Sequence, residues 1–265
     1  NAWRVLDPEK VLEAARAADR HLASGQTIGP LHGLPIPVKD SVNTSEYPTS
    51  AGTRALEHFQ PPEDAELIKR LKAAGGIVMG KTNLHEMSFG WTSNNLAFGA
   101  VRNPYNPDRI PGGSSGGTGA AIGARMAPLG IAEDTQGSTR VPAALCGVYG
   151  YRPTQNRYPN GGVTPITPIF DQVGPHTRSV ADLILFDEVI TGETSPAVSD
   201  PVAILEGARI GTSRDFYFNN LHPDVERITN ESLERLANAG ATIVEANVPN
   251  LRELVAEITD PVQIY

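Results

Sequence analysis

Two distant segments of the chain share one order of elements: an amphipathic helical run, a glycine stop and a short apolar strand. The first comprises residues 64–74, with apolar side chains at helical spacing, and residues 77–79. The second comprises residues 223–239 and 242–244. Glycine separates helix from strand in both, as is common where a helix ends. This repeated order predicts an α/β structure with helices packed against a sheet. The side chains expected to face the core are Leu67, Ile68 and Leu71 in the first helix and Val225, Ile228, Leu233 and Leu236 in the second.

Two further helices and one strand are predicted from similar signals. Residues 8–23 carry an apolar stripe at helical spacing. Another helix is expected after Ser179, because Ser179 and Asp182 have the spacing of a capping box before an apolar run. Residues 34–40 form a short strand-like run that ends in charge.

The composition is that of a globular protein and argues against several functions. Of 265 residues, 40% are hydrophobic and 20% charged, which is enough apolar material for a sizeable core. The net charge of -8 is spread along the sequence without a basic stripe, which argues against nucleic-acid binding. No apolar run approaches the ~18 residues that a membrane span needs. The single cysteine, Cys146, favours a reducing compartment, so we predict a cytoplasmic protein. Because the chain starts at Asn1, a preceding targeting segment stays open.

A glycine-rich turn, Gly112-Gly-Ser-Ser-Gly-Gly117, opens a run of small residues that we expect to be helical. Such a turn can hold a phosphate on its backbone N–H groups. The phosphate-loop pattern, however, needs a lysine before its final Ser or Thr, and none is present. Ile122 stands where the dinucleotide pattern needs a small residue. The sequence therefore argues against a nucleotide cofactor.

Ser138 lies where an apolar run breaks into a loop of small residues, just before a predicted helix. The backbone N–H groups around such a serine can face a developing oxyanion, which is typical of a nucleophile. The alternative is that Ser138 only caps the helix, the commoner role of serine in this setting. This segment alone leaves both interpretations open.

A serine nucleophile needs a base, and the six histidines have no recognisable catalytic or metal-ligand spacing. His85 begins like a zinc-protease motif, but Phe89 occupies the position of its second histidine. We therefore predict no metal and no cofactor. Lys39 is the other candidate, because burial at the end of an apolar run lowers the pKa of a lysine. We expect Lys39 to lie away from carboxylates, with Asp40 on the opposite face of the strand. The alternative is an exposed Lys39–Asp40 pair.

Together these segments resemble the amidase signature family. The core of the resemblance is Gly112-Gly-Ser-Ser-Gly-Gly117, then Asp134-Thr-x-Gly-Ser-x-Arg140, then Cys146-Gly-x-x-Gly-x-x-Pro-Thr154. Further matches are Gly33-Leu-Pro-Ile-Pro-Val-Lys-Asp40, Gly80-Lys-Thr-Asn83, Phe98-Gly-x-x-x-Asn-Pro104 and Phe170-Asp-x-x-Gly-Pro175. These motifs are long, stand in the family's order and extend over roughly residues 8–262.

The resemblance implies a role for each matching residue. Ser138 corresponds to the nucleophile, Ser114 to a bridging serine that follows a cis Gly113–Ser114 bond, and Lys39 to the base. The backbone N–H groups of the loop would stabilise the oxyanion. Ser115 would support the site by hydrogen bonding, and Asp134 and Arg140 would pair to hold the loop. The predicted oxyanion residues are Thr135, Gln136, Gly137 and Ser138.

The resemblance also implies a fold, a reaction and a substrate class. The expected fold is α/β, a mixed β-sheet core covered by helices on both sides. It would form a single amidase signature domain over residues 1–265 that is incomplete at its C-terminal end, with an incomplete N-terminus also open. The expected reaction is hydrolysis of a small arylacetic primary carboxamide, with mandelamide hydrolases as the nearest group. The expected partner is this amide alone, and a homodimer stays open.

Gln136 bears on the alternatives, because many relatives have glycine at this position of the oxyanion loop. One alternative is the glutaminase subunit of a tRNA-dependent amidotransferase, which normally has that glycine and needs partner subunits. Another is a catalytically inactive binding homologue. Retention of Lys39, Ser114 and Ser138 together argues against the inactive homologue.

Overall fold

The computed structural model describes residues 1–196, 200 and 202–264, and the side chains up to residue 257. Its contacts divide the chain into two compact units, Asn1–Ser195 and Pro196–Tyr265. The single domain over residues 1–265 stays a prediction.

The first unit is built on a six-stranded sheet with the strand order β1-β3-β2-β4-β6-β5. The central strands β3, β2 and β4 run parallel, whereas β1, β6 and β5 pair antiparallel with their neighbours. The predicted mixed sheet is thus confirmed. In chain order the elements are β1 (Trp3–Leu6), α1 (Pro8–Ala23), β2 (Pro35–Lys39), η1 (Arg54–Leu56), α2 (Glu66–Ala73), β3 (Ile77–Thr82), η2 (Glu86–Ser88), α3 (Gly116–Gly123), β4 (Leu129–Asp134), α4 (Arg140–Leu145), β5 (Tyr149–Gly150), β6 (Gln172–Thr177) and α5 (Val180–Thr191).

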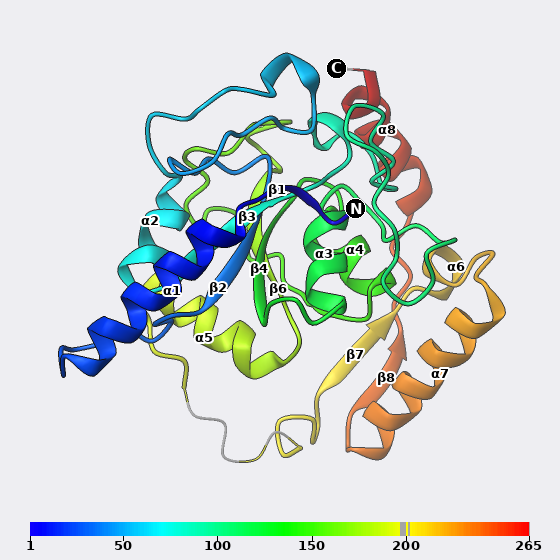
Figure 1. Ribbon diagram of the computed structural model, residues 1–265. Helices are drawn as coiled ribbons and strands as arrows, with labels where there is room; N and C mark the ends of the chain where they lie inside the picture. The colour runs from blue at the N-terminus through cyan, green and yellow to red at the C-terminus, as the bar shows by residue number, and fades with distance from the viewer. Residues whose placement is uncertain (197–199, 201, 265) are drawn as a thin grey trace. The chain divides into compact units, whose positions relative to one another are not determined.

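Helices cover both faces of this sheet, as predicted. Figure 1 shows α2 and α5 on one side of β2 and β4, and α3 and α4 on the other. The larger core lies under α2 and α5, where Val38 of β2 packs with Leu67, Leu71 and Phe186. Since side chains alternate along a strand, Lys39 points to the opposite face, toward α3. The alternation of side chains along β2 therefore decides on which face of the sheet the site forms.

Small residues allow α3 to lie close against the sheet. A Cβ atom on Gly117 would overlap the backbone oxygen of Asn83, which follows β3. A Cβ atom on Gly130 of β4 would come within 2.7 Å of the Thr118 methyl group. The glycine-rich run from residue 112 onward therefore lets α3 pack closely against the sheet. This close packing brings the start of α3 to the end of β2.

The predicted helix starts are confirmed at two places. Helix α1 begins at Pro8, and the Asp7 side chain caps it by accepting from the Lys10 N–H. At α5, Ser179 Oγ accepts from the Asp182 N–H at 3.1 Å, and the two side chains are hydrogen-bonded at 2.7 Å. The capping box of Ser179 and Asp182 was therefore enough to place the start of α5, whereas α1 was predicted from its apolar spacing.

The second unit contains a two-stranded parallel sheet with helices. Helix α7 and the strand β8 after it lie where they were predicted, β7 was not predicted, and the predicted buried face of α7 is only partly right. Val225 is 50% exposed and Ile228 53% exposed, because a sheet of two strands offers little surface to cover them. The elements are β7 (Arg209–Thr212), α6 (Arg214–Tyr217), α7 (Pro223–Asn238), β8 (Thr242–Glu245) and α8 (Leu251–Ile264).

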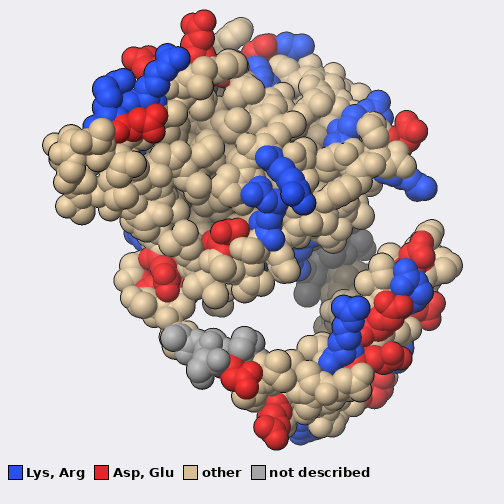
Figure 2. Space-filling model, turned by 60° about the horizontal axis from the view of Figure 1, so that its bottom comes forward, with Lys and Arg blue, Asp and Glu red and all other residues tan. Residues whose placement is uncertain are grey.

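Two surface properties bear on partners. On the face that Figure 2 shows, acidic and basic side chains of the described residues are interspersed, in keeping with the net charge of -8. Among the residues that the structure describes, no helix combines the length and the apolar character needed to cross a membrane.

Candidate active site

The candidate site lies at the carboxyl ends of the parallel strands β2, β3 and β4. Lys39 is the last residue of β2, and Glu133 and Asp134 are the last two of β4. All three side chains are fully buried. In open α/β sheets, ligands bind at the carboxyl ends of the strands. The sheet thus brings the predicted base to the edge where a site is expected.

Lys39 is surrounded by three acceptors. Its Nζ donates to Ser114 Oγ at 2.7 Å, to Glu133 Oε2 at 3.0 Å and to the Glu133 carbonyl oxygen at 3.3 Å. Burial lowers the pKa of Lys39, and the negative charge of Glu133 opposes this shift. The net lowering favours the neutral amine, the form that can accept a proton.

The contacts of Lys39 correct one expectation and confirm another. The expectation that Lys39 lies away from carboxylates is wrong, because β4 runs beside β2 and brings Glu133 within 3.0 Å. The expectation that Asp40 points to the other face is confirmed, because Asp40 pairs with Lys81 at 3.2 Å. An exposed Lys39–Asp40 pair is excluded, since both side chains are fully buried.

Glu133 is the residue that our sequence analysis missed. Its Oε2 also accepts from Ser41 Oγ at 3.2 Å and from Ser88 Oγ at 3.1 Å, and its Oε1 accepts from Thr135 Oγ1 at 3.2 Å. A signal was available in the sequence: two consecutive acidic residues end the apolar run 129–132. A carboxylate in such a run is rarely buried without a cation.

Ser114 lies just before α3, next to a backbone that fits only glycine. The bond between Gly113 and Ser114 is cis, as the resemblance implied. A Cβ atom on Gly113 would come within 2.7 Å of the Trp91 carbonyl carbon and 2.8 Å of the Gly90 oxygen. The Ser114 carbonyl oxygen accepts from the His85 N–H at 3.0 Å. These contacts hold the Ser114 hydroxyl at Lys39.

Ser138 is nearly buried, with 4% of its surface exposed, and lies beside the Ser114 segment. Its carbonyl oxygen accepts from the Ser115 N–H at 3.2 Å, and Ser115 Oγ donates to the Glu133 carbonyl oxygen at 3.1 Å. Ser115 thus joins the two segments. Ser138 is not the cap of α4, because Thr139 holds that position. Within the described residues the Ser138 hydroxyl makes no hydrogen bond, so a direct Ser114–Ser138 contact stays a prediction.

Asp134 organises the loop that carries Ser138. Its carboxylate accepts from the N–H groups of Gly137 at 2.7 Å and Thr139 at 3.0 Å, and pairs with the Arg140 side chain at 3.0 Å. Burial alone would raise the pKa of Asp134, but the hydrogen bonds and charge of Arg140 and the loop N–H groups lower it. The carboxylate therefore stays ionised and holds the loop closed.

This loop offers three of the four predicted oxyanion donors. Gly137 is the exception, because its N–H already donates to Asp134. The N–H groups of Thr135, Gln136 and Ser138 have no acceptor within the described residues. Thr135 is otherwise fixed through its hydroxyl, which lies 2.6 Å from Asp171 Oδ1. Three unpaired backbone donors beside Ser138 suit a developing negative charge.

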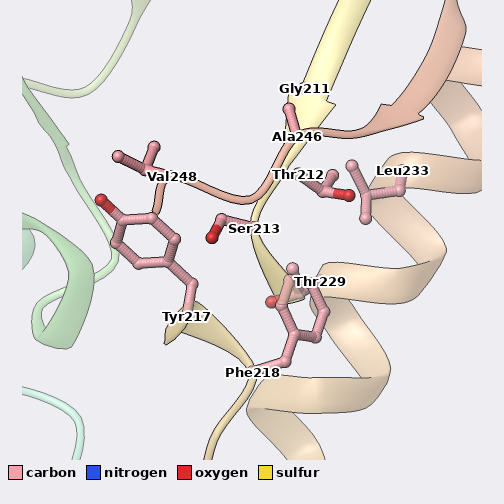
Figure 3. A pocket seen from close by; sticks show the side chains of 9 residues that line it. All are labelled: Gly211, Thr212, Ser213, Tyr217, Phe218, Thr229, Leu233, Ala246 and Val248. Carbon is pink, nitrogen blue, oxygen red and sulfur yellow. The ribbon is translucent and has the colours of Figure 1, made fainter. Parts of the chain in front are cut away.

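The second unit has a pocket of about 370 Å³ that is a weaker candidate. Figure 3 shows Thr229 and Leu233 of α7 on one side of it, and Tyr217, Phe218 and Val248 among the remaining lining residues. The residues that line it in the structure include no carboxylate, histidine, lysine or cysteine. It can hold an apolar group but has no acid–base pair. Among the described residues, no three His, Cys, Asp or Glu side chains group closely enough to hold a metal ion.

Comparison with known proteins places the chain beside amidases. A family model described as Amidase matches residues 1–262. The indoleacetamide hydrolase of Rhizobium radiobacter is 43% identical over 265 residues, which is 100% of this chain and 56% of that protein. A glutamyl-tRNA(Gln) amidotransferase subunit from Chloroflexus aurantiacus is 40% identical over 262 residues, covering 95% of this chain and 54% of that protein.

Solved structures of amidases are also similar to this chain. A crystal structure of an amidase superposes with a TM-score of 0.87 at 36% identity, covering 95% of this chain and 56% of that one. The native peptide amidase of Stenotrophomonas maltophilia gives a TM-score of 0.81 at 33% identity, covering 97% and 56%. The chain spans about half the length of the curated relatives it matches.

Proposed function

The chain belongs to the amidase family, and from this we propose that the protein hydrolyses a small primary carboxamide of the arylacetic type to the acid and ammonia. Lys39, Ser114 and Ser138 carry the reaction. The observation that carries the proposal is the 2.7 Å contact between Lys39 Nζ and Ser114 Oγ in a fully buried site. A lysine there is deprived of water and faces a hydroxyl, which is the Ser-Lys variant of nucleophilic catalysis.

The proposed steps move one proton along this line. Neutral Lys39 accepts the Ser114 proton while Ser114 takes the proton of Ser138, and Ser138 Oγ attacks the amide carbon. The N–H groups of Thr135, Gln136 and Ser138 stabilise the oxyanion. The proton returns through Ser114 to the leaving nitrogen, the C–N bond breaks and ammonia departs. Water then attacks the acyl-serine by the same route and releases the carboxylic acid.

The substrate class is supported by the relatives. Indoleacetamide, in the name of the 43% identical relative, is an arylacetic primary amide, as is the mandelamide that we expected from the sequence. The amidotransferase relative is similar at 40% identity and supports the alternative, a glutaminase acting within a complex. Gln136 in the oxyanion loop argues for the simple amidase. The cytoplasmic location and the homodimer stay predictions.

The test is to assay the full-length protein for ammonia release from indoleacetamide, mandelamide and glutamine. We expect turnover of the arylacetic amides, with Ser138→Ala inactive and wild-type protein carrying a transient acyl group on Ser138 by mass spectrometry. Turnover of glutamine alone would instead support the glutaminase. No turnover of any amide, or full activity of Ser138→Ala, would contradict the proposal. An inactive binding homologue predicts neither turnover nor an acyl group.

A further inference from the structure

Glu133 supplies two of the three acceptors around Lys39, and their arrangement suits a neutral amine as well as a cation. A lysine ammonium has three N–H donors, which match Ser114 Oγ, Glu133 Oε2 and the Glu133 carbonyl oxygen. A neutral amine has two N–H donors and one lone pair. If the two donors stay on Glu133, the lone pair is left facing the Ser114 hydroxyl. Glu133 therefore determines in which direction Lys39 can accept a proton.

The Glu133 carboxylate is itself fixed. Lys39, Ser41 and Ser88 donate to Oε2 at 3.0, 3.2 and 3.1 Å, and Thr135 donates to Oε1 at 3.2 Å. These donors come from β2, the residues after it, η2 and the loop after β4. Three donors on Oε2 and full burial hold the Glu133 side chain in one position.

We propose that Glu133 is a positioning residue of the proposed amide hydrolysis: it aims the Lys39 lone pair at Ser114, and its charge sets the pH at which that lone pair becomes available. This inference rests on the proposed function. It goes beyond the Lys39, Ser114 and Ser138 relay, because Glu133 neither donates to nor attacks the substrate.

The other charged groups near Lys39 are already engaged or neutral. On β4, Asp134 is paired with Arg140, and after β2, Asp40 is paired with Lys81. On β6, burial lowers the pKa of His176 to about 4, so this ring is uncharged near neutral pH. Burial also lowers the pKa of His85, on the segment before η2.

Asp171, just before β6, is the remaining carboxylate of this network. Burial raises its pKa, and its Oδ1 lies 2.6 Å from the Thr135 hydroxyl that also reaches Glu133. A threonine hydroxyl has one proton, so it cannot donate to both carboxylates at once. The contact with Asp171 is the shorter one, so Thr135 joins the two carboxylates, while Lys39 Nζ donates to Glu133. Glu133 is thus the carboxylate in direct contact with Lys39.

The test is the pH dependence of amide hydrolysis by the full-length Glu133→Gln variant. The amide oxygen can still accept from Lys39, but the charge is gone. The pH at which kcat and kcat/KM rise should fall by about one unit or more, since an opposite charge at this range shifts a pKa by about 1–3 units. The plateau rate should also fall, because the weaker base accepts a proton less readily. A lower rate with an unmoved midpoint, or a midpoint moved upward, would overturn the inference.

Two further variants make the test specific. Asp40→Asn removes a carboxylate that is equally buried and adjacent in sequence but faces Lys81, so its midpoint should stay at the wild-type pH. If Glu133→Gln does not fold, Glu133→Asp keeps the charge and withdraws it from Nζ by one methylene. Its midpoint should move in the same direction by less, and an unchanged midpoint would overturn the inference. Wild-type turnover with unmoved midpoints contradicts only this inference, whereas absent wild-type turnover contradicts the proposed function.

Discussion

Lys39 and Lys81 are two buried lysines with nearly the same surroundings on adjacent parallel strands. Both are fully buried near the carboxyl ends of β2 and β3. Lys39 pairs with Glu133 at 3.0 Å and Lys81 with Asp40 at 3.2 Å. Burial lowers both pKa values, that of Lys81 to about 8. Burial beside a carboxylate is therefore not what distinguishes a base from a structural ion pair.

The difference lies in the hydroxyl that each lysine contacts. Lys39 reaches Ser114, whose neighbour Ser115 binds the Ser138 segment. Lys81 donates to Thr49 Oγ1 at 2.7 Å and to the Val42 carbonyl oxygen at 2.8 Å. Thr49 Oγ1 in turn donates to the same carbonyl at 3.5 Å, so these contacts close within the loop after β2. We therefore assign proton transfer to Lys39 and loop anchoring to Lys81.

The largest expected effect is that of Lys39→Ala on turnover. Loss of a general base lowers kcat by about 10²–10⁴-fold. The variant also leaves Glu133 buried without its cation, which should lower the free energy of unfolding by about 3–5 kcal/mol. Steady-state kinetics with circular dichroism as a folding control measures both. A folded variant that keeps kcat within tenfold of wild type would remove Lys39 from the reaction.

Lys81→Met should lose stability but, unlike Lys39→Ala, keep most of its activity. It leaves Asp40 buried without a cation, so we expect a similar loss of about 3–5 kcal/mol in the free energy of unfolding. Because Lys81 does not contact Ser114 or Ser138, kcat of the folded protein should change only a few-fold. Chemical denaturation and kinetics on the same preparation test this. A loss of kcat as large as that of Lys39→Ala would erase the distinction between the two lysines.

A smaller effect is expected in the pH dependence of stability. The pKa of Lys81 is about 8 in the folded protein against 10.5 ordinarily. Between these values the unfolded chain holds a proton that the folded protein lacks, so the free energy of unfolding should rise with pH. The rise should be roughly 3 kcal/mol. Lys81→Met should lack this contribution and keep only that of Lys39, so its free energy of unfolding should rise less with pH than that of wild type. Parallel curves for the two proteins between pH 8 and 10.5 would contradict the assignment.

Local signals predicted much of the fold. Helix α1 spans the residues 8–23 whose apolar spacing predicted it, and α5 starts where Ser179 predicted it, because capping depends on neighbouring residues. The face of α2 was also predicted, since Leu67 and Leu71 repeat at helical spacing. Val225 was expected to be buried and is half exposed, because periodicity identifies an apolar face but not what covers it.

The candidate site was predicted in part. Lys39, Ser114 and Ser138 were recognised from motifs, and the structure places the first two in contact. Glu133 was missed because its partner Lys39 is 94 residues away, and no local pattern pairs two strands over that distance. The Gly137 N–H was expected to face an oxyanion, but it donates to the Asp134 carboxylate instead. That hydrogen bond depends on how the loop folds, which no local pattern predicts.

The most direct test of the central claim is the pH–rate profile of three full-length proteins: wild type, Lys39→Ala and Lys81→Met. If Lys39 is the neutral base, wild type and Lys81→Met should share one rise of kcat with pH that levels off, because both contain the same titrating amine. Lys39→Ala should lack this rise and show a low, flat rate. A rise that persists in Lys39→Ala, or one that disappears in Lys81→Met, would contradict the account.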